Sequence, residues 1–256
     1  MTTRAPLSAV VTTYNNAATL ERCLASLAFC DEIVVLDSDS TDATREIASR
    51  YGVRVDIEPF KGYGPQKQSA IDRARHDWVL LLDADEHLSE AGREAIEREL
   101  RAPRADGYRL PRQEWLFWRW PHPLTRPNWQ LRLFRRSRGR MNAVPVHAAP
   151  EIDGAPIDLD APFLHYGEPR LHDRVDKVNR YSSGLLERKR RPALLGLRLL
   201  LYPPFAFAKL YFGKRYFLNG WAGYFAAKTQ AFYAFLKYAK ILESQRTQSP
   251  PLKKGD

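Results

Sequence analysis

The sequence predicts an α/β fold in which a mostly parallel sheet is flanked by helices and followed by an amphipathic helical extension. Three observations support this prediction. Apolar runs of strand length alternate with helical periodicity over residues 1–101, and polar residues gather where those runs end. The composition then becomes rich in Arg, Trp and Pro over residues 102–170, and basic and aromatic over residues 171–245.

The first section supplies the strands and helices of the expected sheet. Apolar runs predict strands at residues 7–14, 32–37, 53–58 and 78–83. Helical spacing predicts helices at residues 17–29, from Ser40 or Thr41 to about Tyr51, and at residues 64–75, with Gly52 ending the second one. Since a strand–helix–strand crossover is right-handed and joins parallel strands, this order implies a mostly parallel sheet covered by helices.

The two later sections are less regular. Alternation in YRLPRQEW (108–115) and WQLRLFRR (129–136) favours extended strands. The apolar stretch at 193–212 is interrupted by charged residues and by two prolines, whereas residues 221–243 carry an amphipathic helical pattern. Residues 246–256 are polar and contain prolines, and they are expected to form a disordered tail.

Length and cysteine content restrict the class of protein. A chain of 256 residues with 44% hydrophobic residues can bury a sizeable core, which excludes a small scaffold held by disulfides. Cys23 and Cys30 lie seven positions apart on one predicted helix and cannot easily bridge. The N-terminus lacks a signal-peptide pattern, and no run of 18 uncharged apolar residues exists. These features favour a reduced, cytoplasmic compartment.

Charge is distributed unevenly along the chain. Residues 1–100 carry 11 Lys and Arg against 18 Asp and Glu, whereas residues 101–256 carry 29 against 12. Such an asymmetry indicates that the basic part meets an anionic partner, either nucleic acid or a membrane with its phosphorylated lipids. Ordinary solubility is the alternative explanation.

Polar residues follow three of the predicted strands at the ends where open parallel sheets bind ligands. Thr12 and Tyr14 end the first strand, residues 37–39 follow the second, and residues 83–86 follow the fourth. The last group places three carboxylates within four positions. Carboxylate oxygens suit Mg²⁺ or Mn²⁺, although acids that precede a helix also complement its dipole.

Four motifs, in this order, resemble glycosyltransferase family 2 with a GT-A fold: VVTTYNNAATLERCLASL, DEIVVLDSDSTDATREIA, GPQKQSAID and WVLLLDADE. Farther on, RLFRR, VPVH, LHYGEP and KVNRYSS resemble the subgroup of bacterial lipopolysaccharide core β-1,4-glucosyltransferases of the WaaE/KdtX type. The resemblance implies a Rossmann-like GT-A domain. Residues 1–101 would form its nucleotide-sugar-binding half, and residues 102–170 its acceptor-binding and catalytic half.

The resemblance also implies roles for individual residues at the strand ends. Thr12 and Tyr14 would contact the nucleotide base. Asp83 would approach the ribose, and Asp85 would coordinate Mn²⁺ or Mg²⁺ on the sugar diphosphate. Glu86 and His87 would support these residues or cap the following structure.

One motif departs from the family pattern. Where the family reads V-D-D-G-S-T-D, with the second Asp holding the base, this chain reads LDSDSTD and has Ser38 at that position. Base contact would therefore come from Ser38, Asp37 or a neighbour. Asp42 is expected to cap the helix that follows.

Cationic and aromatic residues provide further candidates. Gln66 and Lys67 open a predicted helix and could meet donor phosphate at its N-terminus, with solvent exposure as the alternative. Arg132 and Arg135 could bind anionic groups of the donor or acceptor. Four tryptophans could stack on sugar or lipid, or belong to the core: Trp115, Trp118, Trp120 and Trp129.

The catalytic base is the least constrained role. An inverting transferase needs a group that takes a proton from the acceptor hydroxyl. The subgroup's V-H-E pattern appears here as VHAAPE, so Ala148 stands where the acid is expected. Glu151, His147 or a residue elsewhere would then serve. A structural hydrogen-bonding role is the alternative for His147.

Together these implications predict an inverting, metal-dependent transferase. It would move a hexose, expected to be glucose from UDP-glucose, to the inner-core heptose of a lipopolysaccharide precursor, which is a lipid-linked oligosaccharide. Transfer to a polyprenyl phosphate or another cell-surface glycan is one alternative. A basic nucleic-acid-binding protein is the alternative from another class, but no recognisable nucleic-acid motif accompanies the charge.

The section over residues 171–245 predicts attachment to a membrane surface. Its aromatic and leucine-rich pattern is interspersed with Lys and Arg, as in helices that lie in the interface of anionic lipid. We therefore expect a peripheral protein on the inner face of the cytoplasmic membrane. Packing of these helices onto the catalytic domain or a second subunit is the alternative.

Overall fold

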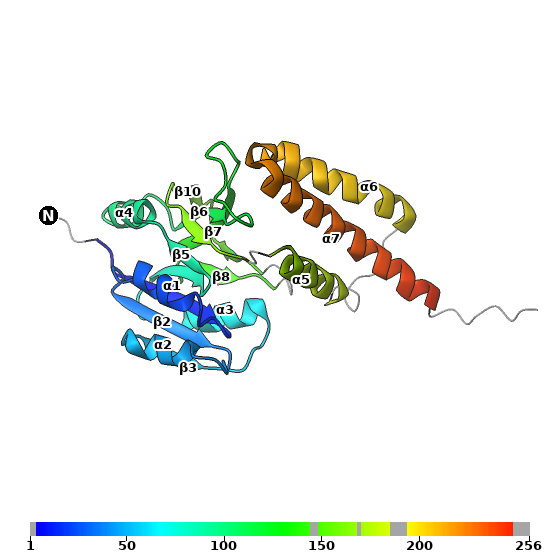
Figure 1. Ribbon diagram of the computed structural model, residues 1–256. Coiled ribbons are helices and arrows are strands. Elements are labelled where there is room, and N and C mark those ends of the chain that lie inside the picture. Colours follow the sequence, from blue (N-terminus) through cyan, green and yellow to red (C-terminus); the bar gives the residue numbers. More distant parts are fainter. Residues whose placement is uncertain (1–3, 144–147, 168–169, 185–193, 248–256) are drawn as a thin grey trace, which may run out of the picture. The chain divides into compact units, whose positions relative to one another are not determined.

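The computed structural model describes residues 4–143, 148–167, 170–184 and 194–247. The chain divides into two compact units, shown in Figure 1. The first comprises residues 1–114 and 127–166, and the second comprises residues 115–126 and 167–256. The loop at 115–126 thus groups with the C-terminal helices, and one sheet continues across the predicted boundary at residues 101 and 102. The functional division at that boundary stays a prediction.

The first unit is built on one large sheet, whose strands follow the order β3-β2-β1-β4-β7-β6-β11-β5, with β10 beside β6. Its strands are β1 (Leu7–Thr13), β2 (Glu32–Asp37), β3 (Arg54–Ile57), β4 (Trp78–Asp83), β5 (Glu86–Leu88), β6 (Gly107–Glu114), β7 (Asn128–Arg135), β10 (Ile157–Asp158) and β11 (Phe163–His165). Pairing is parallel from β3 to β4 and at β6 with β10 and β11, and antiparallel around β7 and β5. The predicted mostly parallel sheet is confirmed.

Four helices and a hairpin complete this unit. They are α1 (Leu20–Ser26), α2 (Thr44–Arg50), α3 (Tyr63–Asp72), α4 (Glu90–Glu99) and the pair β8 (Gly139–Met141) and β9 (Pro150–Ile152). The four predicted strands are found within a residue at each end, and the predicted helices are found but shorter. Gly52 adopts a φ of +64° just after α2, so a glycine ends this helix as the sequence predicted.

Two hydrophobic layers cover the opposite faces of the sheet. One contains Ala9 and Val11 of β1 together with apolar residues of α1, α2 and α4. The other contains Val10, the intervening residue of β1, with apolar residues of α3. Alternate residues of a central strand are therefore buried on both sides, which explains its continuous apolar run. Cys23 and Cys30, both in described segments, are free.

The second unit is helical. It contains α5 (Leu171–Gly184), α6 (Leu195–Ala208), a π-helical turn (Lys209–Gly213), a 3₁₀ turn (Tyr216–Asn219) and α7 (Gly220–Thr247). Leu116 and Phe117 pack with Ala222 and Ala226, which joins the loop to α7. Among the described ranges, none of the helices has the length and hydropathy to cross a bilayer.

Within the apolar stretch at 193–212, α6 continues through Pro203 and Pro204. One sequence-based expectation for this unit needs correction. The predicted tail begins too early, because α7 runs to Thr247. The rest of the tail, residues 248–256, lies outside the described residues.

Candidate active site

Asp83 ends β4, with β1 on one side of that strand and β7 on the other. The register of the sheet pairs Thr12 with Asp83. The Thr12 hydroxyl donates a 3.1 Å hydrogen bond to Asp83 Oδ1. Two predicted donor contacts that are far apart in sequence thus lie side by side at the carboxyl ends of parallel strands.

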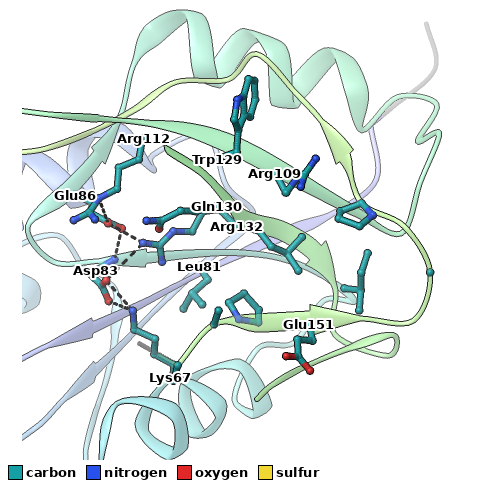
Figure 2. Close-up of a pocket in the computed structure, with 17 residues that line it drawn as sticks. Lys67, Leu81, Asp83, Glu86, Arg109, Arg112, Trp129, Gln130, Arg132 and Glu151 are labelled. Carbon is teal, nitrogen blue, oxygen red and sulfur yellow. Dashed lines mark hydrogen bonds and ion pairs between the residues drawn. The ribbon is translucent and has the colours of Figure 1, made fainter. Parts of the chain in front are cut away.

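Two cations surround the Asp83 carboxylate. Lys67 Nζ lies 2.6 Å from Asp83 Oδ1 and 2.8 Å from Oδ2, and Arg132 Nη2 lies 3.7 Å from Oδ2. Burial alone would raise the pKa of Asp83, but Lys67 and Arg132 outweigh it and hold that pKa well below its usual range. Asp83 is therefore ionised at neutral pH. Figure 2 shows the three side chains converging at one end of a pocket.

Glu86 is fully buried and contacts both Arg132 and the backbone of Asp83. Arg132 Nη2 donates a 2.7 Å hydrogen bond to Glu86 Oε1, and Arg112 Nε lies 3.3 Å from the same atom. The backbone N–H of Asp83 donates to Glu86 Oε2 at 3.1 Å. Burial, helped by the nearby Asp83 charge, raises the pKa of Glu86 despite Arg132 and Arg112. Glu86 thus supports the residues of the site and does not cap the following structure; these were the two roles that the sequence left open.

Asp85 has a different partner. His165 Nε2 lies 3.1 Å from Asp85 Oδ2, because β11 pairs with β5 and brings His165 opposite Glu86. Burial would raise the pKa of Asp85, but the hydrogen bond from His165 reverses this and lowers it. Next to this pair, His87 stacks on Tyr166 with ring centroids 5.4 Å apart.

Asp85 and His165 are suited to hold a divalent cation. A carboxylate oxygen and an imidazole nitrogen lie within 3.1 Å of each other, and both side chains are partly exposed. Across the described part of the chain, three or more His, Cys, Asp or Glu side chains nowhere gather in a metal-binding group. The Asp85 carboxylate nevertheless fits Mg²⁺, which is usually held by one or two carboxylates with substrate phosphates and water.

The predicted base contacts after β1 and β2 differ in their exposure to solvent. Asp37 is fully buried, and its carboxylate accepts hydrogen bonds from the Ser40 hydroxyl and, at 2.8 Å, from the Ser40 N–H. The Asp37 carboxylate is thus engaged within the loop, and its role as a base contact stays a prediction. Ser38 is also mostly buried, whereas the Tyr14 ring is 58% exposed at the end of β1. Tyr14 is the side chain free to stack on a base.

The loops after β1 and β2 are tied together. The Asn15 N–H donates to Ser40 Oγ, and the Thr41 N–H donates to Asn15 Oδ1, both at 2.8 Å. Asp39 occupies the position of the family's glycine and adopts a φ of +67°, a left-handed conformation that Asp tolerates better than most residues. Asp42 lies one position before the N-cap Ala43 and accepts a 3.0 Å bond from the first N–H of α2, that of Thr44.

Two residues that were predicted to contact anionic groups, Gln66 and Arg135, point away from the pocket or lie far from it. Gln66 is buried, and its side-chain amide bonds the Glu58 carbonyl and the Lys61 N–H, so it fixes a loop. Arg135 pairs with Asp77 at 3.1 Å and stacks on Trp78, which begins β4 and lies at the opposite end of that strand from Asp83. Neither residue belongs to the site.

A pocket of about 590 Å³ extends from Asp83 over β4, β7 and β6 to the β8–β9 hairpin. Lys67, Arg109, Arg112 and Arg132 line it, together with Trp129 and Glu151. Figure 2 shows Glu151 at the other end of the pocket from Asp83. Its Oε1 accepts a 3.1 Å hydrogen bond from Asn142 Nδ2. The second predicted base, His147, lies outside the described residues.

The other three predicted candidates among the tryptophans belong to the second unit. Trp115 and Trp120 pack edge to face, with centroids 4.9 Å apart, and the Trp115 indole N–H donates to the Phe117 carbonyl. Trp118 is exposed to solvent, and its ring packs edge to face on Phe225. Only Trp129 among the four predicted candidates lines the described pocket.

Sequence reasoning missed His165 and Arg112 as parts of the site. His165 lies in the LHYGEP motif, so its membership in the subgroup pattern was visible in the sequence. The motif does not indicate which residue His165 contacts. Arg112 lies in a predicted strand, where alternation alone did not separate pocket-facing arginines from exposed ones. Both assignments depend on how β6, β11 and β5 pair.

Comparisons with known proteins bear on the same regions. A family model described as glycosyl transferase family 2 matches residues 8–149. The lipopolysaccharide core biosynthesis glycosyltransferase LpsC of Rhizobium meliloti (strain 1021) is 33% identical, covering 98% of this chain and 97% of its own length. An uncharacterized glycosyltransferase of Rickettsia bellii is 28% identical, covering 98% of this chain and 90% of its own length. Both alignments include the C-terminal helices.

Similarity to solved structures is weaker. Staphylococcus aureus TarS, residues 1–349 with UDP, is 16% identical over 95% of this chain and 92% of that one, with a TM-score of 0.48. Glucosyl-3-phosphoglycerate synthase from Mycobacterium tuberculosis with Mn²⁺, UDP and phosphoglyceric acid is 23% identical over 43% of each chain, with a TM-score of 0.37. The sequence relatives therefore carry the assignment to a family.

Proposed function

The chain belongs to glycosyltransferase family 2, and from that premise we propose that it transfers a hexose from a nucleotide-sugar to a lipid-linked oligosaccharide with inversion at the anomeric carbon. One observation carries the proposal. The end of β4 presents an ionised Asp83 beside Thr12 and an Asp85 beside His165, at the edge of the sheet where ligands bind.

The donor would lie across the ends of β1, β2 and β4. The exposed Tyr14 ring offers a stacking surface for the base, and Ser38, which is itself mostly buried, is the other proposed base contact. Thr12 and Lys67 hold the Asp83 carboxylate in a fixed orientation, so that it can accept a hydrogen bond from a ribose hydroxyl. Preorganisation of this kind lowers the cost of ordering the site when the donor binds.

Asp85 and His165 are the residues that would hold Mn²⁺ or Mg²⁺. When bound, the ion supplies charge neutralisation to the departing diphosphate. The lowered pKa of Asp85 keeps its carboxylate ionised and ready to coordinate. His165 is part of this proposal because its Nε2 contacts the Asp85 carboxylate and would orient it toward the ion.

The acceptor would occupy the pocket over β7 and β6. Its hydroxyl oxygen attacks the anomeric carbon from the face opposite the diphosphate, the carbon–oxygen bond to the diphosphate breaks, and the hydroxyl proton passes to a base. Glu151 lines this pocket and is the proposed base. It lies three positions after Ala148, which stands where the subgroup has its acid. His147 remains the alternative. Trp129 offers an apolar face for a sugar ring.

The similarity to LpsC supports a lipopolysaccharide core acceptor. We propose glucose from UDP-glucose as the transferred sugar, the inner-core heptose as its acceptor, and the inner face of the cytoplasmic membrane as the place of reaction. Transfer to a polyprenyl phosphate or another cell-surface glycan is the competing proposal.

A transfer assay tests this function. The purified chain is incubated with Mn²⁺, UDP-glucose labelled in the glucose, and a lipopolysaccharide precursor that ends at the inner-core heptose; we expect label in the lipid product. Glu151→Gln should lower kcat by about 100-fold or more while leaving donor affinity intact, and Asp160→Asn, an exposed control, should behave as wild type. Label on polyprenyl phosphate alone would favour the competing proposal, and no transfer from any nucleotide-sugar would refute both.

A further inference from the structure

α6 presents a row of large apolar side chains to solvent. Leu197, Leu200, Leu201 and Phe205, here called the apolar stripe, are each 50 to 72% exposed. Their spacing of three and four positions places them on one face of the helix. Within the described chain, not one residue of α6 is fully buried. This helix therefore leaves its apolar face without a covering layer in the second unit.

α6 packs on α7 through aromatic rings outside the apolar stripe. Phe207 packs edge to face on Tyr224 of α7 at 5.9 Å, and Tyr202 packs on Tyr238 at 5.1 Å. Figure 1 shows α6 lying along α7. Since α6 uses these rings to pack on α7, the stripe is not what holds the two helices together. An exposed apolar row of this size indicates an interaction surface.

Charge selects the kind of partner. Residues 188–242, which include the stripe, contain 11 Lys and Arg and not one Asp or Glu. Just after the π-helical turn, burial lowers the pKa of Lys214, and the neighbouring cations Lys209 and Arg126 add to this effect. A second copy of this surface would bring positive charge against positive charge, so self-association is opposed by charge.

We propose that the apolar stripe of α6 inserts into the interfacial region of an anionic lipid bilayer, with the surrounding Lys and Arg on the phospholipid head groups. Leu and Phe gain from leaving water, and each basic residue near the surface adds attraction to anionic lipid. Nucleic acid would satisfy the cations but not four exposed Leu and Phe side chains. The inference rests on the second unit alone and holds whatever sugar the first unit transfers.

Flotation of the full chain with vesicles tests this surface. Wild type should float with vesicles that contain phosphatidylglycerol, less with vesicles of phosphatidylcholine alone, and less again as NaCl rises. Leu200→Glu with Phe205→Glu should reduce the partition coefficient by at least about tenfold. Tyr51→Glu with Ile57→Glu is the matched control, because it adds the same two charges at exposed apolar positions of the first unit and should bind as wild type.

Two further measurements keep the test decisive. Trp221, which is 70% exposed, should report insertion by a blue shift of its fluorescence that Trp221→Phe abolishes. Circular dichroism establishes that the stripe variant is folded. Absence of flotation at low salt, or equal flotation of the stripe variant and wild type, overturns the proposal. So does a wild-type dimer in sedimentation velocity that the stripe variant converts to monomer, since the stripe would then cover a second copy.

Discussion

At the end of β4, the Asp83 carboxylate lies between Lys67 and Arg132, and these cations decide its charge. Its folded-state pKa lies below the value of about 3.9 in an unfolded chain. Ionised Asp83 therefore stabilises the fold above pH 4, and this contribution is lost as the pH falls through the folded-state pKa. The same ionisation is what a ribose contact requires.

Replacing Lys67 by Met tests this linkage. Burial raises the pKa of Asp83, and without Lys67 only Arg132 opposes it closely. The pKa of Asp83 should therefore rise, and the acid limb of kcat/KM should move to higher pH. Lys61→Met is the control, because Lys61 pairs with Glu58 and not with Asp83. A pH profile unchanged by Lys67→Met, or shifted equally by both variants, would show that Lys67 does not control the charge of Asp83.

Residue-scale prediction succeeded where a strand end alone determines position, and failed where a distant partner does. Asp83 and Asp85 follow an apolar run whose end is readable from the sequence. His165 meets Asp85 only because β11 pairs antiparallel with β5, a pairing between segments about 80 positions apart. Asp37 and the exposed Asp39 look alike in the sequence, yet Ser40 hydrogen-bonds the Asp37 carboxylate in a buried loop position.

At the scale of elements, the strands were predictable because their apolar runs are short and end in polar residues. The helices of the second unit were harder, because two adjacent prolines usually end a helix. α6 passes through Pro203 and Pro204 and is followed by a π-helical turn at Lys209–Gly213. Packing of aromatic residues against α7 on both sides of the prolines, at Tyr202 and Phe207, accounts for this continuation.

Gly223 tests how the turn before α7 packs on that helix. A Cβ at Gly223 would lie 1.9 Å from the Tyr216 carbonyl oxygen, so Gly223→Ala should destabilise the protein by about 1–3 kcal/mol. Gly196 lies inside α6 with open space where its Cβ would be, and Gly196→Ala should instead add about 0.5–1 kcal/mol of helix stability. Thermal unfolding followed by circular dichroism measures both, and a stabilising Gly223→Ala would contradict the close approach.

At the scale of the whole molecule, the charge asymmetry of the sequence has a counterpart in the structure. The acidic first hundred residues form the strand ends where the proposed donor binds. The basic remainder supplies the arginines of the pocket and the cations around α6. The sequence indicated an anionic partner for the basic part. Which helix face would meet it could not be predicted, since exposure of the stripe depends on how α6 packs on α7.

The central claim is that Asp85, with His165, holds a divalent cation together with a nucleoside diphosphate. Titration of Mn²⁺ followed by electron paramagnetic resonance tests it most directly, because free Mn²⁺ loses its signal on binding whether or not sugar is transferred. Wild type should bind Mn²⁺ more tightly when UDP is present. Asp85→Asn should weaken that binding by at least about tenfold, while Asp160→Asn should leave it unchanged. Equal binding of Mn²⁺ and UDP by Asp85→Asn and wild type would contradict the account.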